Sequence, residues 1–367
     1  MSEKESFIEM VRVGFESPEE KAEYEADKVN INKQMSRITS KARERAKKDS
    51  CEICKKKCTS FCDSHSVPRF VLRNISENGK VCLPLQGDIA GTGTDTGINK
   101  AGTFNLICNE CDSTIFQLYE DPDAYTARPT DKMLAQIAMK NNLQMISKRY
   151  VEHEIYGLLS EMYPNNEGFA QEKQIIGQFD LDEFKRGLNY AKNVLKMRFG
   201  TGYYLCYYKK LDYVVPYAAQ SGIALLADFD GNVINNVFDF KKSNRLKYIQ
   251  VAIFPFQETS IVLLFVEEGE KAYRKFYRQL NKLPLEDQLA TINYMVFAYT
   301  ENVFLHTKTF EAHRTNPKFK DVCRKITDYT SPIPFLFDDP LDVAVNEFSL
   351  SKRHDIPNLL SKEYALK

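Results

Sequence analysis

Two CxxC pairs, Cys51-Glu-Ile-Cys54 and Cys108-Asn-Glu-Cys111, enclose the stretch of sequence that decides the fold. Each pair can present two thiolates to one ion, and two pairs complete the tetrahedral four-sulfur set of structural zinc sites. The long separation is no obstacle, because a folded loop can bring the pairs together. The sequence therefore predicts a structural Zn²⁺ ion bound by these four cysteines.

Two further cysteines leave an alternative ligand set open. The spacing Cys58-x3-Cys62-x2-His65 could offer three ligands, but that set would leave one CxxC pair without a partner. Seven of the nine cysteines lie between Cys51 and Cys111. In a chain without a visible export signal, such a cluster indicates a metal site rather than a disulfide framework.

The composition is that of a folded protein with several units. The chain has 367 residues, 50 basic and 50 acidic, and 43% of its residues are hydrophobic. This length suggests two or three domains, and the hydrophobic content excludes a wholly disordered chain. No apolar run approaches the roughly 20 residues of a membrane span. The first residues carry no secretory signal pattern, so we expect a cytoplasmic protein without membrane contact.

The balanced total charge hides an uneven distribution. Residues 1–32 hold nine acidic and four basic side chains, whereas residues 33–80 hold thirteen basic and five acidic ones. A local basic block can contact phosphate groups even in a neutral protein, so we expect nucleic acid as a partner, with DNA favoured over RNA. The expected contacts are Lys41, Arg43, Arg45, Lys47, Lys48, Lys55, Lys56, Lys57, Arg69 and Arg73.

Periodicity divides the rest of the chain. Residues 1–50 read as a charged helical arm, because Ser17-Pro18-Glu19-Glu20 is a helix start with a capping box. Residues 51–125 form the cysteine-rich unit. Residues 126–200 read as a helical region, with helices over 130–163 and from Asp180 to Met197.

The C-terminal part changes character after residue 200. Residues 201–350 predict a mixed α+β domain through which the chain could contact a protein partner or a second copy, and residues 351–367 predict a tail. The stretch 87–102 reads as a flexible loop, and residues from 331 onward read as mostly irregular because of their prolines. The expected strands are 203–208, 213–217, 223–229, 248–256 and 260–266, and the expected helices are 268–280 and 285–302.

Between the two CxxC pairs lies the segment Asp63-Ser64-His65-Ser66-Val67-Pro68. A CxxC pair, an SHxxP segment and a second CxxC pair together resemble the zinc-containing branch of the HNH nucleases, over about residues 51–120. The resemblance implies a ββα-metal, treble-clef-like module whose helix begins at the second CxxC pair. The predicted fold class is therefore α+β, with this zinc-bound module, a basic N-terminal helix, a helical middle and a mixed C-terminal domain.

The resemblance implies a nuclease centred on His65. This residue matches the general base that activates a water for attack on a phosphodiester, a role that suits an imidazole titrating near neutral pH. The family also uses a divalent ion, Mg²⁺ or Mn²⁺, separate from the zinc. Bacterial proteins of this build are often defence nucleases, so a phage-defence effector is the implied biological setting.

Three further positions of the family pattern can be matched here. The residue before the histidine and the residue after the last cysteine help to hold the divalent ion in the family, and here they are Ser64 and Asp112. Asp63 could serve in place of Ser64. Asn105 is the nearest match to the family's asparagine, and Asn109 is the other candidate. The resemblance thus implies catalytic roles for His65, Asp112 and Asn105.

Two functions follow, and the sequence favours the first. The first is a metal-dependent endonuclease that acts on nucleic acid phosphodiesters. The second is a catalytically degenerate zinc module that binds nucleic acid or a protein partner, with the acidic segment 1–32 covering the basic one when nothing is bound. The departures from the family pattern at Ser64 and Asp112 separate the two.

Overall fold

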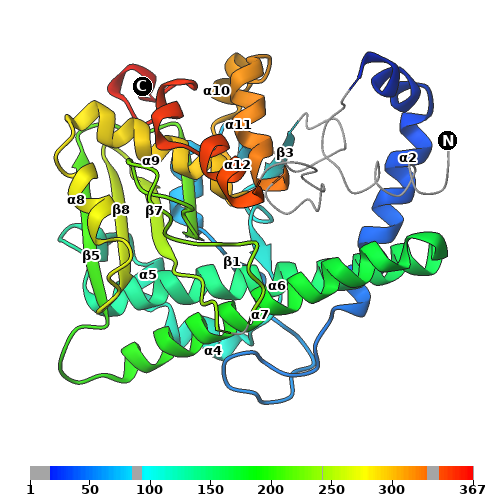
Figure 1. Cartoon of the computed structure of the whole chain (residues 1–367). Helices are drawn as coiled ribbons and strands as arrows, with labels where there is room; N and C mark the ends of the chain where they lie inside the picture. Colours follow the sequence, from blue (N-terminus) through cyan, green and yellow to red (C-terminus); the bar gives the residue numbers. More distant parts are fainter. Residues whose placement is uncertain (1–16, 85–92, 242, 329–338, 367) are drawn as a thin grey trace.

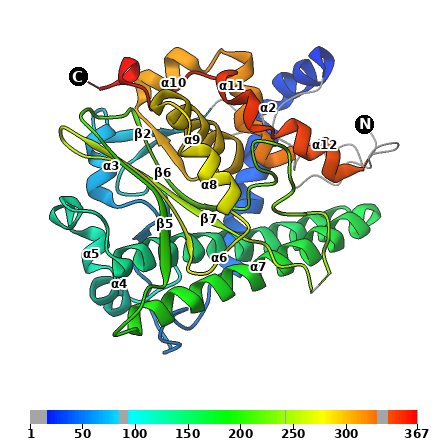
Figure 2. The same ribbon diagram turned by 60° about the vertical axis from the view of Figure 1, so that its left-hand side comes forward.

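The computed structural model describes residues 17–84, 93–241, 243–328 and 339–366. Within these ranges the chain folds as a mixed α+β protein with eleven α-helices and a seven-stranded antiparallel sheet. The sheet lies between two helical layers, as Figures 1 and 2 show from two sides. No helix in the described part is long and apolar enough to cross a membrane.

The elements have the following bounds. The strands are β1 (Ser64–His65), β2 (Lys80–Leu83), β3 (Thr94–Gly97), β4 (Thr103–Phe104), β5 (Tyr203–Leu211), β6 (Tyr217–Ile223), β7 (Ile249–Pro255), β8 (Ser260–Glu267) and β9 (Val303–Leu305). The α-helices are α2 (Pro18–Arg45), α3 (Arg69–Ile75), α4 (Asn109–Ile115), α5 (Gln117–Glu120), α6 (Asp131–Met162), α7 (Glu167–Lys196), α8 (Arg274–Leu280), α9 (Leu285–Tyr299), α10 (Thr307–His313), α11 (Pro317–Asp328) and α12 (Pro340–Glu347). Short 3₁₀ helices are η1 (Pro122–Tyr125), η2 (Pro164–Asn166), η3 (Leu350–His354) and η4 (Lys362–Tyr364).

The sheet has hydrophobic side chains on both faces. In β8, Ile261 and Leu263 belong to the core beneath α6 and α7, whereas Val262 and Leu264 belong to the core beneath α8 and α9. Successive side chains of a strand point to opposite faces. A strand buried on both faces therefore reads as an unbroken apolar run rather than as an alternation.

The sheet also joins segments that lie far apart in the sequence. Its strand order is β3-β2-β9-β6-β7-β8-β5. The strands β2 and β3 come from the cysteine-rich unit, and β2 pairs with β9 at Cys82 and Leu305. The segments 51–125 and 201–350 thus share one sheet, and the proposed division into domains stays a prediction.

The helical layer nearest the cysteine-rich unit is built from α6 and α7. Both helices run along the sheet in Figure 1, and α2 packs on the C-terminal half of α6 through Ile38 and Ala42. The helix predicted over 130–163 is confirmed by α6. The prediction that a second helix starts at Asp180 is wrong, because α7 begins at Glu167 and its packing on α6 extends the helical stretch.

Three other expectations were wrong. Part of the predicted loop 87–102 forms β3, which pairs with β2 through its backbone; residues 85–92 lie outside the described part. The two strands expected over 213–217 and 223–229 are replaced by β6, which lies between them. Residues expected to be irregular include α12, where Asp339 caps the helix and Pro340 takes its first position.

Candidate metal centre

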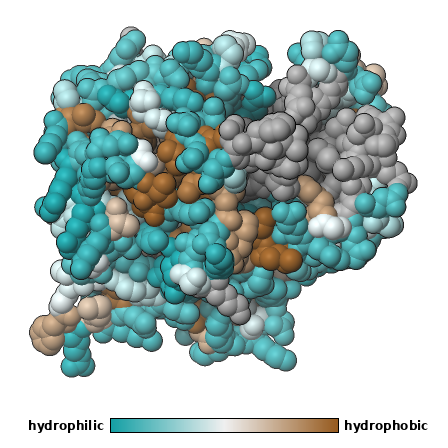
Figure 3. All heavy atoms as spheres, viewed as in Figure 1, coloured by the Kyte–Doolittle hydropathy of each residue, from teal (hydrophilic) through white to brown (hydrophobic). Residues whose placement is uncertain are grey.

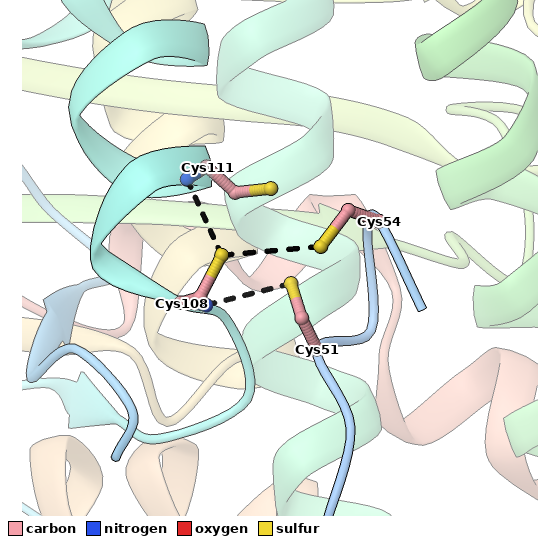
Figure 4. Close-up of side chains that lie close together, drawn as sticks. All are labelled: Cys51, Cys54, Cys108 and Cys111. Carbon is pink, nitrogen blue, oxygen red and sulfur yellow. Dashed lines mark hydrogen bonds between the residues drawn. The ribbon is translucent and has the colours of Figure 1, made fainter. Parts of the chain in front are cut away.

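The four cysteines of the two CxxC pairs come together at one point. Their sulfur atoms all lie within 4.8 Å of one another, and Figure 4 shows two arriving from the loop after α2 and two from the start of α4. The sulfurs of Cys54 and Cys108 are 3.9 Å apart. Zn–S bonds of about 2.3 Å in a tetrahedron require sulfurs roughly 3.8 Å apart, so this set fits zinc. Among the described residues, no other group of three or more such ligands gathers.

Backbone hydrogen bonds hold the two pairs in place. The first pair sits in a tight turn in which the Lys55 N–H donates to the Cys51 carbonyl and Lys55 takes a left-handed φ of 61°. The Glu52 N–H donates to the Leu106 carbonyl and so ties this turn to the second pair. Cys108 caps α4, because its sulfur accepts from the Cys111 N–H at 3.5 Å. The ligand geometry therefore depends on local turns rather than on long side chains.

The pKa values of two of the four thiols shift in opposite directions. Burial raises the pKa of Cys51, but N–H groups of Cys54, Cys108 and Ile53 outweigh it and lower the pKa to about 7. The pKa of Cys111 is raised by burial and by its neighbouring sulfurs. One thiolate is thus stabilised while a nearby thiol keeps its proton. A bound cation would relieve this conflict, because metal ligation favours deprotonation of all four.

The alternative ligand set is not brought together. The sulfur of Cys58 donates to the Lys56 carbonyl at 3.3 Å, and the sulfur of Cys62 donates to Asp112 Oδ2 at 3.3 Å. Neither residue belongs to the four-cysteine group. Burial and the nearby Asp112 carboxylate raise the pKa of Cys62 to about 12, which disfavours its thiolate.

His65 lies in β1, one strand of the two-stranded sheet formed by β1 and β4. It pairs with Thr103 of β4, and α4 is the next element after β4 along the chain. The His65 Nε2 atom lies 3.0 Å from the Ile98 carbonyl oxygen. Because the carbonyl can only accept, this contact favours the tautomer with the proton on Nε2 and leaves the Nδ1 lone pair available. Burial lowers the pKa of His65, so its imidazole is neutral at pH 7.

Asp112 is held by a buried lysine that the sequence pattern did not single out. The Lys140 ammonium of α6 lies 2.9 Å from Asp112 Oδ1 and 2.7 Å from Ser64 Oγ, and Ser64 donates to the same carboxylate oxygen at 2.7 Å. The Lys140 side chain is fully buried, with Glu120 Oε1 at 3.6 Å. Burial raises the pKa of Asp112, but Lys140 outweighs this effect and lowers it.

The two asparagine candidates are both exposed and follow β4 along the chain. Asn105 donates to the Asp63 carboxylate at 2.6 Å and to the Cys62 carbonyl at 3.1 Å. In the described residues no hydrogen bond or ion pair joins Asn105 or Asp63 to His65. Asn109 is exposed at the first position of α4. The structure therefore brings Asp63 and Asn105 together, and it pairs Ser64 with Asp112.

The ten basic residues expected to contact nucleic acid are all exposed. Three of them have a carboxylate nearby: Arg45 pairs with Glu161, Lys55 with Glu52, and Lys56 lies 3.8 Å from Glu110. Lys48 lies over the Tyr150 ring. No carboxylate of the described residues lies within ion-pair distance of Lys41, Arg43, Lys47, Lys48, Lys57, Arg69 or Arg73.

The positions that would hold a second, divalent ion do not fit one. Such an ion needs several oxygen ligands free to bind it. Here the ammonium of Lys140 already contacts both Ser64 and Asp112, which are hydrogen-bonded to each other, and it is shielded from solvent. A lysine ammonium carries one positive charge at this point and offers no coordination site, so the donor set for Mg²⁺ or Mn²⁺ is incomplete.

No protein-family model, curated protein or solved structure matches this chain. The resemblance to the HNH nucleases therefore rests on the quoted residues alone. What the structure adds is a four-cysteine cluster with geometry suited to zinc.

Proposed function

We propose that the chain is a nucleic-acid-binding protein built on a zinc-bound, HNH-like module that has lost its divalent-ion site. Zinc bound by the four cysteines would fix the module, and exposed basic side chains from α2 to α3 would contact the phosphate backbone. The observation that carries the proposal is the buried Lys140 ammonium in contact with both Ser64 and Asp112.

The burial of Lys140 is the reason to prefer binding over cleavage. Moving a charged ammonium and its carboxylate apart inside a protein is strongly unfavourable, because each would then be buried without a partner. An incoming Mg²⁺ would have to displace the ammonium, which also lies 4.2 Å from the centre of the Phe116 ring. Lys140 thus supplies the positive charge that a divalent ion would bring, in a place where it is shielded from substrate.

The exposed basic residues support the partner class. Lysine and arginine side chains that neutralise phosphates release counterions, so binding of this kind weakens steeply with salt. Arg69 and Arg73 project from α3, and Lys41 and Lys47 come from α2 and the turn after it. Their side chains are free of carboxylate partners among the described residues. Recognition of this kind is largely independent of sequence.

Fluorescence anisotropy with labelled DNA and RNA duplexes tests the proposal. The zinc-loaded chain should bind, and a variant with Arg69→Gln and Arg73→Gln should bind more weakly and with a shallower salt dependence. The log–log slope should fall by about one for each phosphate that is no longer neutralised. The matched control replaces Lys271 and Lys320, which are exposed and lie outside the basic segment, by Gln. An equal weakening in both variants would argue against a defined interface.

The second candidate is the endonuclease, and the geometry of His65 favours it. The Ile98 carbonyl orients the imidazole, the lowered pKa keeps it neutral, and Nδ1 is left to accept a proton from water. Plasmid and RNA cleavage by the wild type and by His65→Ala, with and without divalent ions, separates the candidates. Zinc content measured in both samples shows whether the variant is folded. Cleavage that disappears in His65→Ala with zinc retained would establish the nuclease.

A further inference from the structure

A cavity lies between the paired helices α6 and α7 and the end of β6, away from the cysteine cluster. It has two adjoining chambers of about 310 and 200 Å³. Both are lined by Met145, Arg149, Asp180 and Tyr299. On the face drawn in Figure 3, apolar residues gather near the middle of a mostly hydrophilic surface, above the long helices of Figure 1. Cavities of this size suit a small organic molecule.

The larger chamber is lined by charged side chains, most of which are paired. Lys148 lies 2.6 Å from Glu301. Arg149 pairs with Glu152, and its Nε atom lies 3.0 Å from Asp180. These pairs join neighbouring turns of α6 to α7 and to the residues after α9. The carboxylates of Glu152, Asp180 and Glu301 are therefore already paired with basic side chains.

Lys173 is the exception in the larger chamber. Its side chain lines the cavity and the residue is only 8% exposed, yet no carboxylate of the described residues lies within ion-pair distance of its ammonium. Its aromatic neighbour is the Phe169 ring, 5.7 Å away. Burial lowers the pKa of Lys173 to about 8, so the ammonium is mostly charged at pH 7. Glu172 and Glu152 attract this ammonium only from beyond ion-pair distance. Among the described residues it has no counter-charge in contact, and an anion in the cavity would stabilise it.

The smaller chamber has a different chemistry. Its wall is largely apolar, and five of its rings come from α7 and from the segment between β6 and β7. These rings are Phe179, Phe184, Phe238, Phe240 and Tyr248. Such a chamber suits a flat, apolar group, because ring edges and faces can pack on it.

We propose that this cavity binds a small organic anion, with its charged group paired to Lys173 and its aromatic part in the smaller chamber. The site is separate from the zinc module, and the proposal is independent of whether that module cleaves nucleic acid. The anion can be a phosphate or a carboxylate, since both would pair with the ammonium.

Calorimetric titration of the zinc-loaded full chain tests the site with simple probes. The probes are 1-naphthyl phosphate and 1-naphthoate, which distinguish the two anions, with 1-naphthol and inorganic phosphate as half-ligands. Lys173→Met removes the charge and keeps the length of the side chain, and Lys196→Met on the exposed end of α7 is its control. Gly177→Leu tests the cavity independently by filling part of the larger chamber, which Gly177 lines. A Cβ at this position would meet no atom within 4 Å, so the side chain can be accommodated in the folded chain.

We expect at least one naphthyl anion to bind at least about tenfold more tightly than either half-ligand, and both Lys173→Met and Gly177→Leu to weaken it about tenfold or more. Lys196→Met should bind as the wild type does. Gly168→Leu is the control for Gly177→Leu, since Gly168 lies on the same helix in open space outside the cavity. Absence of binding, binding no tighter than that of 1-naphthol, or full binding by Lys173→Met in a chain with an unchanged melting temperature would overturn the proposal.

Discussion

The Lys140 ammonium lies 2.9 Å from the Asp112 carboxylate and is fully buried. This pair links the N-terminal half of α6 to α4, the helix that carries Cys111. It also places a fixed positive charge at the position that the HNH-like pattern assigns to a divalent ion. The preference for nucleic-acid binding over metal-dependent cleavage follows from this relationship.

Removal of the lysine should destabilise the fold. Lys140→Met leaves the mostly buried Asp112 carboxylate without its partner, and we expect a loss of about 3 kcal/mol in the free energy of unfolding. Urea denaturation measures it. The double variant Lys140→Met with Asp112→Asn removes both charges and should recover a large part of the loss. A single variant as stable as the wild type would show that the pair does not matter.

His65 should make the fold less stable in acid. Burial lowers its pKa in the folded state below the value of about 6.5 for an exposed histidine. The folded state then binds fewer protons than the unfolded state between these two values, so stability is lost as pH falls below about 6.5. The difference in unfolding free energy between pH 7.5 and pH 5.5 should shrink in His65→Asn. A midpoint above 6.5 for His65 in an NMR titration would contradict this account.

The ligand set can be read from metal content. Wild type should hold one zinc per chain, and Cys51→Ser or Cys111→Ser should lose it together with much of the thermal stability, because structural zinc contributes directly to folding. Cys58→Ser is the matched control, since its sulfur lies outside the cluster. Zinc loss in Cys58→Ser with zinc retained in Cys111→Ser would mean that the ligands are assigned wrongly.

Features with a local cause could be predicted from the sequence. The CxxC spacing is such a feature, since each pair forms its own turn and only closure of the intervening loop is needed. The helix expected over 130–163 matches α6 within one residue at each end, because Thr130 caps it and an apolar stripe follows. The charged helix that starts at Pro18 could also be predicted from a local signal, the helix start Ser17-Pro18-Glu19-Glu20.

Features set by tertiary contacts could not be predicted in this way. The strand β3 is polar and rich in threonine and glycine, and only its pairing with β2 makes it a strand. From the sequence alone Lys140 resembles an ordinary surface lysine, and only the packing of α6 against the cysteine-rich unit shows that it is buried. A weak signal was present: Lys140 and Asn141 stand three and four residues after Ile137, at core-facing positions of an otherwise apolar run.

The most direct test of the account is the salt dependence of nucleic-acid binding by the zinc-loaded chain. The logarithm of the association constant for a labelled duplex, measured by anisotropy between about 50 and 200 mM salt, should fall linearly and steeply with the logarithm of the salt concentration. The slope should become shallower when Arg69 and Arg73 are replaced by Gln, and cleavage should be absent with or without Mg²⁺. No detectable binding at low salt, or binding whose slope is unchanged in that variant, would contradict the account.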